Sequence, residues 1–124
     1  MLHLYVEEIK DRHPLALAFI GDAVMSLVVR KRMVLSANMK VDRLHKESSQ
    51  VVCAKAQSKR YDSLLENNLF TDEEAALAHR AFNAKHNTVP NNCTLCEYRK
   101  ATALEAVIGY NFLLGNTARV EELI

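Results

Sequence analysis

Two acidic residues stand alone inside apolar stretches of this sequence, and carboxylates are side chains that bind metal ions and activate water. Asp22 lies in "LALAFIGDAVMSLVVRKR", which begins at Leu15, and Glu105 lies in "YRKATALEAVIGYNFLL", which begins at Tyr98. In a helix, residues three and four positions apart share a face. The neighbours of both acids at this spacing include no base: Ala18, Phe19, Met25 and Ser26 for Asp22, and Ala101, Thr102, Ile108 and Gly109 for Glu105.

An ionised carboxylate is costly to bury without a partner, so each acid must be paired, bound to a metal or turned toward water. Two carboxylates that converge in a helical core are suited to Mg²⁺, a cation that prefers oxygen ligands and keeps several waters. The alternative is that each acid pairs with a base, for which Lys55 is the candidate because it shares a predicted helix face with Leu44 and Val51. The residues alone leave both interpretations open.

The elements that must position these acids are helices. The chain has only 3 Gly and 2 Pro among 124 residues, and the stretches between them have helical periodicity. Two sequences have the form of a capping box, "TDEE" from Thr71 and "TLCE" from Thr94. We therefore predict an all-α compact helical domain, 1–124, with five helices: 14–35, 41–66, 71–83, 94–114 and a short closing helix after the Gly in "GNTARVEELI".

The longest helix-breaking stretch is "NAKHNTVPNN", from Asn83 to Asn92. A long polar loop in a compact domain is often functional, although it also fits a simple solvated connection between helices.

The overall composition excludes several classes of function. Lys plus Arg number 16 against 15 for Asp plus Glu, so the net charge of +1 gives no global attraction to nucleic acid. No apolar stretch reaches the length of a membrane span, and the N-terminus lacks the pattern of a secretory signal, so we expect a cytoplasmic protein. Three cysteines are too few for a disulfide framework. The spacing of Cys93 and Cys96 in "CTLC" leaves a zinc or redox module as a minor alternative, without a second pair of ligands.

Four segments resemble the ribonuclease III family in the same order along the chain. "FIGDAV" is similar to the signature of that family, and "ALEAVIGY" is similar to its second acidic motif. The Mini-III branch, which has only the catalytic domain, is the closer resemblance. It extends over "LALAFIGDAV", "LHKESSQVVCAKAQSK", "RAFNAKHNTVPNN" and "YRKATALEAVIGY", which together span nearly the whole chain.

The resemblance implies a homodimeric endoribonuclease that cleaves double-stranded RNA with Mg²⁺, or with Mn²⁺ as a substitute, and has no separate double-stranded-RNA-binding domain. It assigns the catalytic, metal-binding positions to Asp22 and Glu105. For the Mini-III branch it further implies trimming of the base-paired ends of the large-subunit (23S) ribosomal RNA precursor, in which a ribosomal protein can take part. Two glutamates of the full-length family are replaced here by Leu15 and Ala18, and an aspartate by Thr102, a reduced set that the Mini-III branch shares.

Duplex RNA is recognised through phosphates and 2′-hydroxyl groups, so contact residues should be cationic or carry amide and hydroxyl groups. The polar loop resembles the one through which the Mini-III branch engages RNA, and its His86 is a candidate for a phosphate contact. The predicted RNA-binding residues are Asn83, Lys85, His86, Asn87 and Thr88 in or beside the loop, and Lys46, Lys55, Lys59 and Arg99 outside it.

A different class of function is a helical module that binds RNA or the ribosome without catalysis, because related domains that have lost their acids have such roles. Retention of both Asp22 and Glu105 favours the enzyme, since a module that only binds RNA has no need of them.

Overall fold

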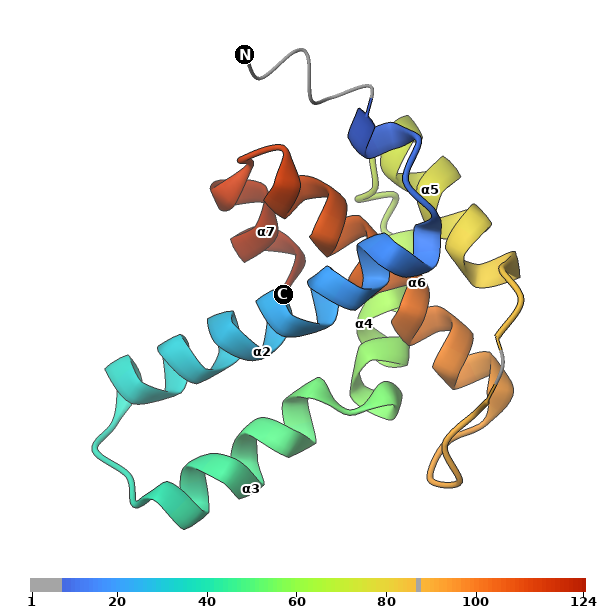
Figure 1. The fold of residues 1–124 in the computed structure, drawn as a ribbon. Helices are drawn as coiled ribbons and strands as arrows, with labels where there is room; N and C mark the ends of the chain where they lie inside the picture. The colour runs from blue at the N-terminus through green and yellow to red at the C-terminus, as the bar shows by residue number, and fades with distance from the viewer. Residues whose placement is uncertain (1–7, 87) are drawn as a thin grey trace.

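The computed structural model describes residues 8–86 and 88–124, so the predicted contact residue Asn87 lies outside the described part of the chain. These residues fold into helices joined by short connections, with one longer loop (Figure 1). The predicted all-α class is confirmed. The helices are α2 (Pro14–Ser36), α3 (Val41–Val52), α4 (Ala54–Glu66), α5 (Asp72–Asn83), α6 (Leu95–Leu113) and α7 (Thr117–Leu123).

The core is organised around α6, which packs against α2, α4, α5 and α7. Residues on almost every face of α6 are buried, including Leu104, Val107 and Ile108, each 0% exposed. The first half of α2 crosses α6, while its second half extends away from the body of the molecule beside α3 (Figure 1). A helix surrounded by other helices must be apolar on all sides, which explains the near-continuous apolar pattern after Tyr98.

Both predicted capping boxes are present and begin α5 and α6. The Thr71 backbone N–H donates to Glu74 Oε1 at 2.9 Å, and the Glu74 N–H donates back to Thr71 Oγ1 at 3.1 Å. Thr94 and Glu97 make the same two hydrogen bonds at 2.9 Å and 3.1 Å. Each box satisfies two amides that the first turn of a helix leaves free.

The predicted single helix over 41–66 is wrong. The chain leaves the helical conformation at Cys53, whose φ of −68° and ψ of 157° are extended, so α3 ends and α4 begins there. The structure therefore has one helix more than the five we predicted, within the residues it describes. The break also moves Lys55 off the face of Leu44 and Val51, because the helical spacing that linked them does not continue across Cys53.

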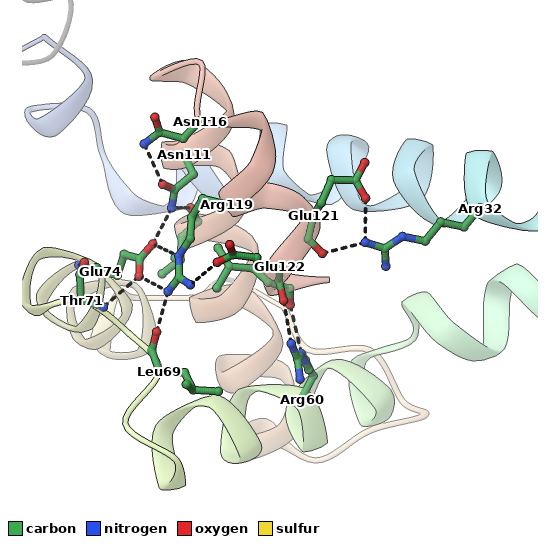
Figure 2. Close-up of polar contacts among 12 residues, drawn as sticks. Arg32, Arg60, Leu69, Thr71, Glu74, Asn111, Asn116, Arg119, Glu121 and Glu122 are labelled. Carbon is green, nitrogen blue, oxygen red and sulfur yellow. Dashed lines mark hydrogen bonds and ion pairs between the residues drawn. The ribbon is translucent and has the colours of Figure 1, made fainter.

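The closing helix α7 is fixed to the body by ion pairs (Figure 2). Arg119 contacts Glu74 of α5 through two nitrogens, at 2.6 Å and 3.0 Å. Two residues further along α7, Glu121 pairs with Lys31 at 2.9 Å and with Arg32 at 2.8 Å. The basic cluster at 30–32 thus uses two of its three charges within the chain.

None of the helices in the described ranges combines the length and the apolar character of a membrane-crossing segment.

Candidate active site

A cleft of about 600 Å³ contains both isolated acids. One wall consists of α2 residues at helical spacing, and the facing wall consists of α6 residues. The start of α4 and the loop between α5 and α6 complete it. The lining residues are Leu15, Ala18, Phe19 and Asp22 of α2, Val52, Cys53 and Ala54 at the helix break, Lys85, His86, Thr88, Pro90 and Asn92 of the loop, and Tyr98, Ala101, Thr102 and Glu105 of α6.

Two glycines bring the acids together by letting the helix backbones touch. A Cβ atom built on Gly21 would overlap the carbonyl oxygen of Glu105, and one built on Gly109 would overlap the carbonyl oxygen of Leu17. The contacts are reciprocal, since each glycine faces the helix that carries the other. Because Gly21 directly precedes Asp22 and meets the backbone of Glu105, this close crossing places one acid beside the other.

The two carboxyl groups interact with each other and, within residues 8–86 and 88–124, form an ion pair with no base. Asp22 is exposed in the cleft, whereas Glu105 is half-buried. Burial raises the pKa of Glu105 to about 9, helped by a hydrogen bond with Asp22 and by repulsion from its charge. In the metal-free protein the pair therefore retains a proton at neutral pH, as expected when two carboxylates share a poorly solvated site.

Lys55 does not neutralise this pair. It is exposed on α4, and its charge acts on Glu97 at the start of α6, where it lowers the pKa of that carboxyl after the hydrogen bonds from Thr94. Among the residues described, neither Asp22 nor Glu105 forms an ion pair with any base. The interpretation that Lys55 pairs with these acids is therefore wrong.

The acid pair has the composition of a site for a hard divalent cation. Two carboxylates offer oxygen ligands to a metal. A divalent cation that displaced the shared proton would be bound by two negatively charged groups. The described residues contain no group of three or more His, Cys, Asp or Glu side chains placed to bind a metal. Water and substrate oxygens would therefore supply most of the coordination, as suits a cation that keeps several waters. Cys93 and Cys96 are both free, and they belong to no such group.

The loop between α5 and α6 brings three of the predicted contact residues to the cleft, namely Lys85, His86 and Thr88. The side chains of Lys85 and Thr88 are exposed, while His86 is half-buried. Asn83 lies at the end of α5 and donates to the carbonyl oxygen of His79 at 2.9 Å, outside the lining of the cleft.

The other predicted cationic residues lie outside the cleft lining. Lys46 is exposed on α3, and Lys55 and Lys59 are exposed on α4. Arg99 is half-buried on α6, where its guanidinium lies 5.9 Å from the centre of the Phe82 ring. These four residues lie on α3, α4 and α6, and none of them lines the cleft of the acid pair.

Two polar lining residues were missed in the sequence. Asn92 belongs to the polar loop, but the selection of contact residues ended at Thr88. Tyr98 shares a helix face with Thr102 and Glu105, because the three follow one another at spacings of four and three residues. Helical spacing counted backward from Glu105 would have found it.

Comparisons with known proteins agree with this geometry. Residues 15–116 match the family model described as "Ribonuclease III domain". The chain is 41% identical over 116 residues to "Mini-ribonuclease 3" of Staphylococcus aureus, covering 94% of this chain and 87% of that protein. It is 39% identical over 118 residues to "Mini-ribonuclease 3" of Thermoanaerobacter sp., covering 95% and 82%.

A solved structure extends the likeness to the fold. The crystal structure of a Fusobacterium nucleatum protein superposes with a TM-score of 0.83 at 37% identity, covering 94% of this chain and 91% of that one. The family model spans both acidic motifs and the loop between them, and members of the family generally use a divalent metal. With the acid pair, the cleft and these matches together, the chain belongs to the ribonuclease III family, in the group of the Mini-ribonuclease 3 endoribonucleases.

Proposed function

We propose that this endoribonuclease cleaves double-stranded RNA and depends on Mg²⁺, with Mn²⁺ able to substitute. The observation that carries the proposal is the acid pair, in which Asp22 and Glu105 face one another in an open cleft without a basic partner among the described residues. A purely structural buried acid would be expected to have such partners.

The roles of the residues follow from the chemistry of phosphodiester hydrolysis. When bound, the metal makes water nucleophilic and offsets the charge that develops on the phosphate oxygens. Asp22 and Glu105 would hold it by their carboxylate oxygens, and the exposed carboxylate of Asp22 is the one open to the cleft. Lys85 offers a cation to a phosphate, and Thr88 offers a hydroxyl group. No side chain needs to act as a covalent nucleophile.

An RNA duplex is broader than the cleft, so the predicted contact residues that lie outside the cleft lining can also contact it. A double helix presents phosphates on both sides of its minor groove, so cations flanking the acid pair can contact it. We assign this role to Lys46, Lys55, Lys59 and Arg99, together with Asn83 and Asn87 at the loop.

We propose that the active form is a homodimer that pairs through α2. The outward face of this helix carries apolar side chains in a row at four-residue spacing: Phe19, which is 83% exposed, then Ala23, then Leu27, which is 65% exposed. Such a row in water is typical of a protein interface. Because Phe19 also lines the cleft, a two-fold axis along this face would place two acid pairs near each other, one for each strand of the duplex.

Within the Mini-III resemblance, the proposed substrate is the base-paired end of the large-subunit ribosomal RNA precursor, cleaved in the cytoplasm and in the presence of a ribosomal protein.

The test is cleavage of an end-labelled, fully paired RNA duplex by purified protein with Mg²⁺, with Mn²⁺ and with chelator. Asp22→Asn and Glu105→Gln are compared with Glu66→Gln, which removes an exposed acid at the far end of α4 from the cleft. We expect metal-dependent cleavage by the wild type and Glu66→Gln. Both site variants should lose about a hundredfold or more in rate while they still bind the duplex.

A wild type that binds the duplex and a precursor ribosomal RNA end without cutting either would contradict the proposal. The protein would then be a binding module of the same fold.

A further inference from the structure

The α6 wall of the cleft carries one polar group that the proposed chemistry does not use, the hydroxyl of Tyr98. Tyr98 is half-buried and lines the cleft seven positions before Glu105. Of the lining residues between them, Ala101 has no polar side chain. The hydroxyl of Thr102, which is 6% exposed, donates to the carbonyl oxygen of Tyr98 at 2.9 Å. This wall therefore offers a substrate two side-chain groups, the carboxyl of Glu105 and the hydroxyl of Tyr98.

The Tyr98 hydroxyl is open to solvent and has no intramolecular partner. It forms no hydrogen bond with any residue that the structure describes. It is also not one of the buried side-chain atoms without a partner, which in this part of the chain are His86 Nε2 and Arg99 Nε. Since an unpartnered polar atom that is not buried is reached by water, a substrate can contact this hydroxyl by displacing that water.

The ring that carries the hydroxyl is held in place. It lies against the ring of His86, with centroids 5.1 Å apart and planes at 76°. A tyrosine side chain has only two torsions to fix, and a group on a helix is placed more precisely than a group on a loop. Lys85, Thr88 and Asn92, which also offer hydrogen-bond donors to the cleft, belong to the loop between α5 and α6. Tyr98 is therefore suited to fix the position of a substrate.

The place of the hydroxyl along the cleft favours a phosphate that flanks the cleaved one. Seven residues of helix rise by about 10 Å, and side chains on one face tilt in the same direction. Tyr98 and Glu105 are thus too far apart to contact one phosphate together. A strand whose cleaved phosphate lies at the acid pair, and which follows the α6 wall, brings another phosphate to Tyr98. The positive charge of Lys85 in the same cleft favours this path of the backbone.

We propose that the Tyr98 hydroxyl donates a hydrogen bond to a non-bridging oxygen of a phosphate that flanks the cleaved one, and so positions the RNA strand along α6. The inference rests on the proposed function, since it assigns a further substrate contact to the same cleft. A ribose 2′-hydroxyl is the other backbone group that a phenol can contact. The phosphate is favoured because hydrogen bonds to a charged group are stronger than those between neutral groups.

The test is cleavage of RNA duplexes in which one phosphate at a time, near the cleavage site, is replaced by an uncharged methylphosphonate. Each methylphosphonate follows a 2′-deoxyribose, because a neighbouring 2′-hydroxyl would attack that linkage. The same deoxyribose with an ordinary phosphate is the reference duplex. Tyr98→Phe removes the hydroxyl and keeps the ring against His86. Its kcat/KM for the all-RNA duplex should be roughly tenfold below that of the wild type.

One flanking position should identify the contact. There, the methylphosphonate should slow the wild type, relative to the reference duplex, roughly tenfold more than it slows Tyr98→Phe. At every other position the two proteins should show equal losses. Tyr61→Phe removes a hydroxyl from a buried ring on α4 outside the cleft, and this matched control should behave as the wild type does.

The inference is overturned if Tyr98→Phe cleaves the all-RNA duplex as fast as the wild type, or if its losses equal those of the wild type at every methylphosphonate. It is also overturned if the deoxyribose of a reference duplex alone produces the difference between the two proteins, because the hydroxyl would then contact a ribose.

Binding distinguishes this inference from the proposed function. If the wild type cuts no RNA duplex, the proposed function fails. The Kd values of the same duplexes for Asp22→Asn, with and without Tyr98→Phe, then test the hydroxyl in the absence of cleavage. We expect Tyr98→Phe to raise the Kd of the all-RNA duplex roughly tenfold and to remove the effect of one methylphosphonate. An unchanged Kd would contradict the inference.

Discussion

At the scale of single residues, two poorly exposed glutamates of this fold have opposite environments. Glu74 is 3% exposed and fully partnered, since it accepts hydrogen bonds from Arg119, Asn111 and the backbone of Thr71 (Figure 2). Burial alone would raise the pKa of Glu74, but these hydrogen bonds outweigh it and lower the pKa. Glu105 has another carboxylate as its partner, and its pKa is raised. The first arrangement stabilises the fold, and the second is the one that we propose binds the metal.

Replacing Glu74 should therefore destabilise the protein. We expect Glu74→Gln to lower the free energy of unfolding at pH 7 by about 3 kcal/mol, because it leaves Arg119 without its buried partner. Urea denaturation measures this. Glu73→Gln, which removes the exposed neighbouring acid, should change the free energy of unfolding by less than about 1 kcal/mol.

The same carboxylate sets a dependence on acid. The folded-state pKa of Glu74 lies below the ordinary value of 4.5, so folding favours its ionised form. The contribution of Glu74 to the free energy of unfolding is complete above about pH 4.5. It is lost as the pH falls through the folded-state pKa of this carboxyl. Wild-type stability should therefore fall more steeply than that of Glu74→Gln below about pH 4.5. Equal slopes would show that folding does not lower the pKa of Glu74.

A divalent cation should stabilise the wild type through the acid pair. At a concentration about a hundredfold above its Kd, the cation would add roughly 2.7 kcal/mol to the free energy of unfolding. The increase in Tm on adding Mg²⁺ or Mn²⁺ should disappear in Asp22→Asn and in Glu105→Gln. It should grow from pH 6 to pH 8, because binding displaces the proton that the pair retains. An equal increase in all three proteins would place the bound cation elsewhere.

The chemistry of these residues was only partly predictable from the sequence. The absence of a base at helical spacing identified Asp22 and Glu105 as an unusual pair. Whether a base reaches them from another helix depends on tertiary contacts, so the sequence alone left Lys55 as an alternative.

At the scale of elements, the crossing of α2 and α6 determines the position of the acids. Gly21 and Gly109 let the two backbones approach each other. Gly21 lies against the backbone of Glu105, and Gly109 lies against the backbone of Leu17. A side chain at either position would force the helices apart. The distance between the carboxylates of Asp22 and Glu105 therefore depends on having glycine, which lacks a side chain, at positions 21 and 109.

Gly21→Ala should consequently affect both stability and catalysis. We expect a loss of about 1–3 kcal/mol in the free energy of unfolding, as is usual for overpacking. Cleavage should fall by roughly a hundredfold at saturating metal, because a displacement of about 1 Å in the acids is enough to disrupt the reaction geometry. Ala76→Ser, at an exposed position of α5 outside both the cleft and the apolar row of α2, is the control for both measurements.

Element boundaries followed from the sequence wherever a local hydrogen bond fixes them. The capping boxes at Thr71 and Thr94 are made by residues three positions apart, so they could be recognised without the fold. The break at Cys53 has no Gly, Pro or capping residue to mark it. It arises because α3 follows α2 while α4 packs against α6, and these two directions differ.

At the scale of the whole molecule, the proposed homodimer depends on the exposed apolar row of α2, Phe19, Ala23 and Leu27. Leu27→Glu places a charge in the middle of that row and should yield a folded monomer by sedimentation equilibrium, with cleavage of duplex RNA strongly reduced. Leu65→Glu changes a similarly exposed leucine, 53% exposed on α4, and should remain dimeric. A wild type that is monomeric at every concentration would show that α2 is not an interface.

The acid pair and the proposed substrate contacts of the loop also belong to different kinds of structure. The acids are built on two helices in direct backbone contact, whereas Lys85, His86 and Thr88 are carried by a loop that spans from α5 to α6. Replacing such a loop leaves the helical crossing intact. Enzymes with this architecture can therefore acquire new substrate preferences during evolution, or through grafted loops in the laboratory, without rebuilding the catalytic centre.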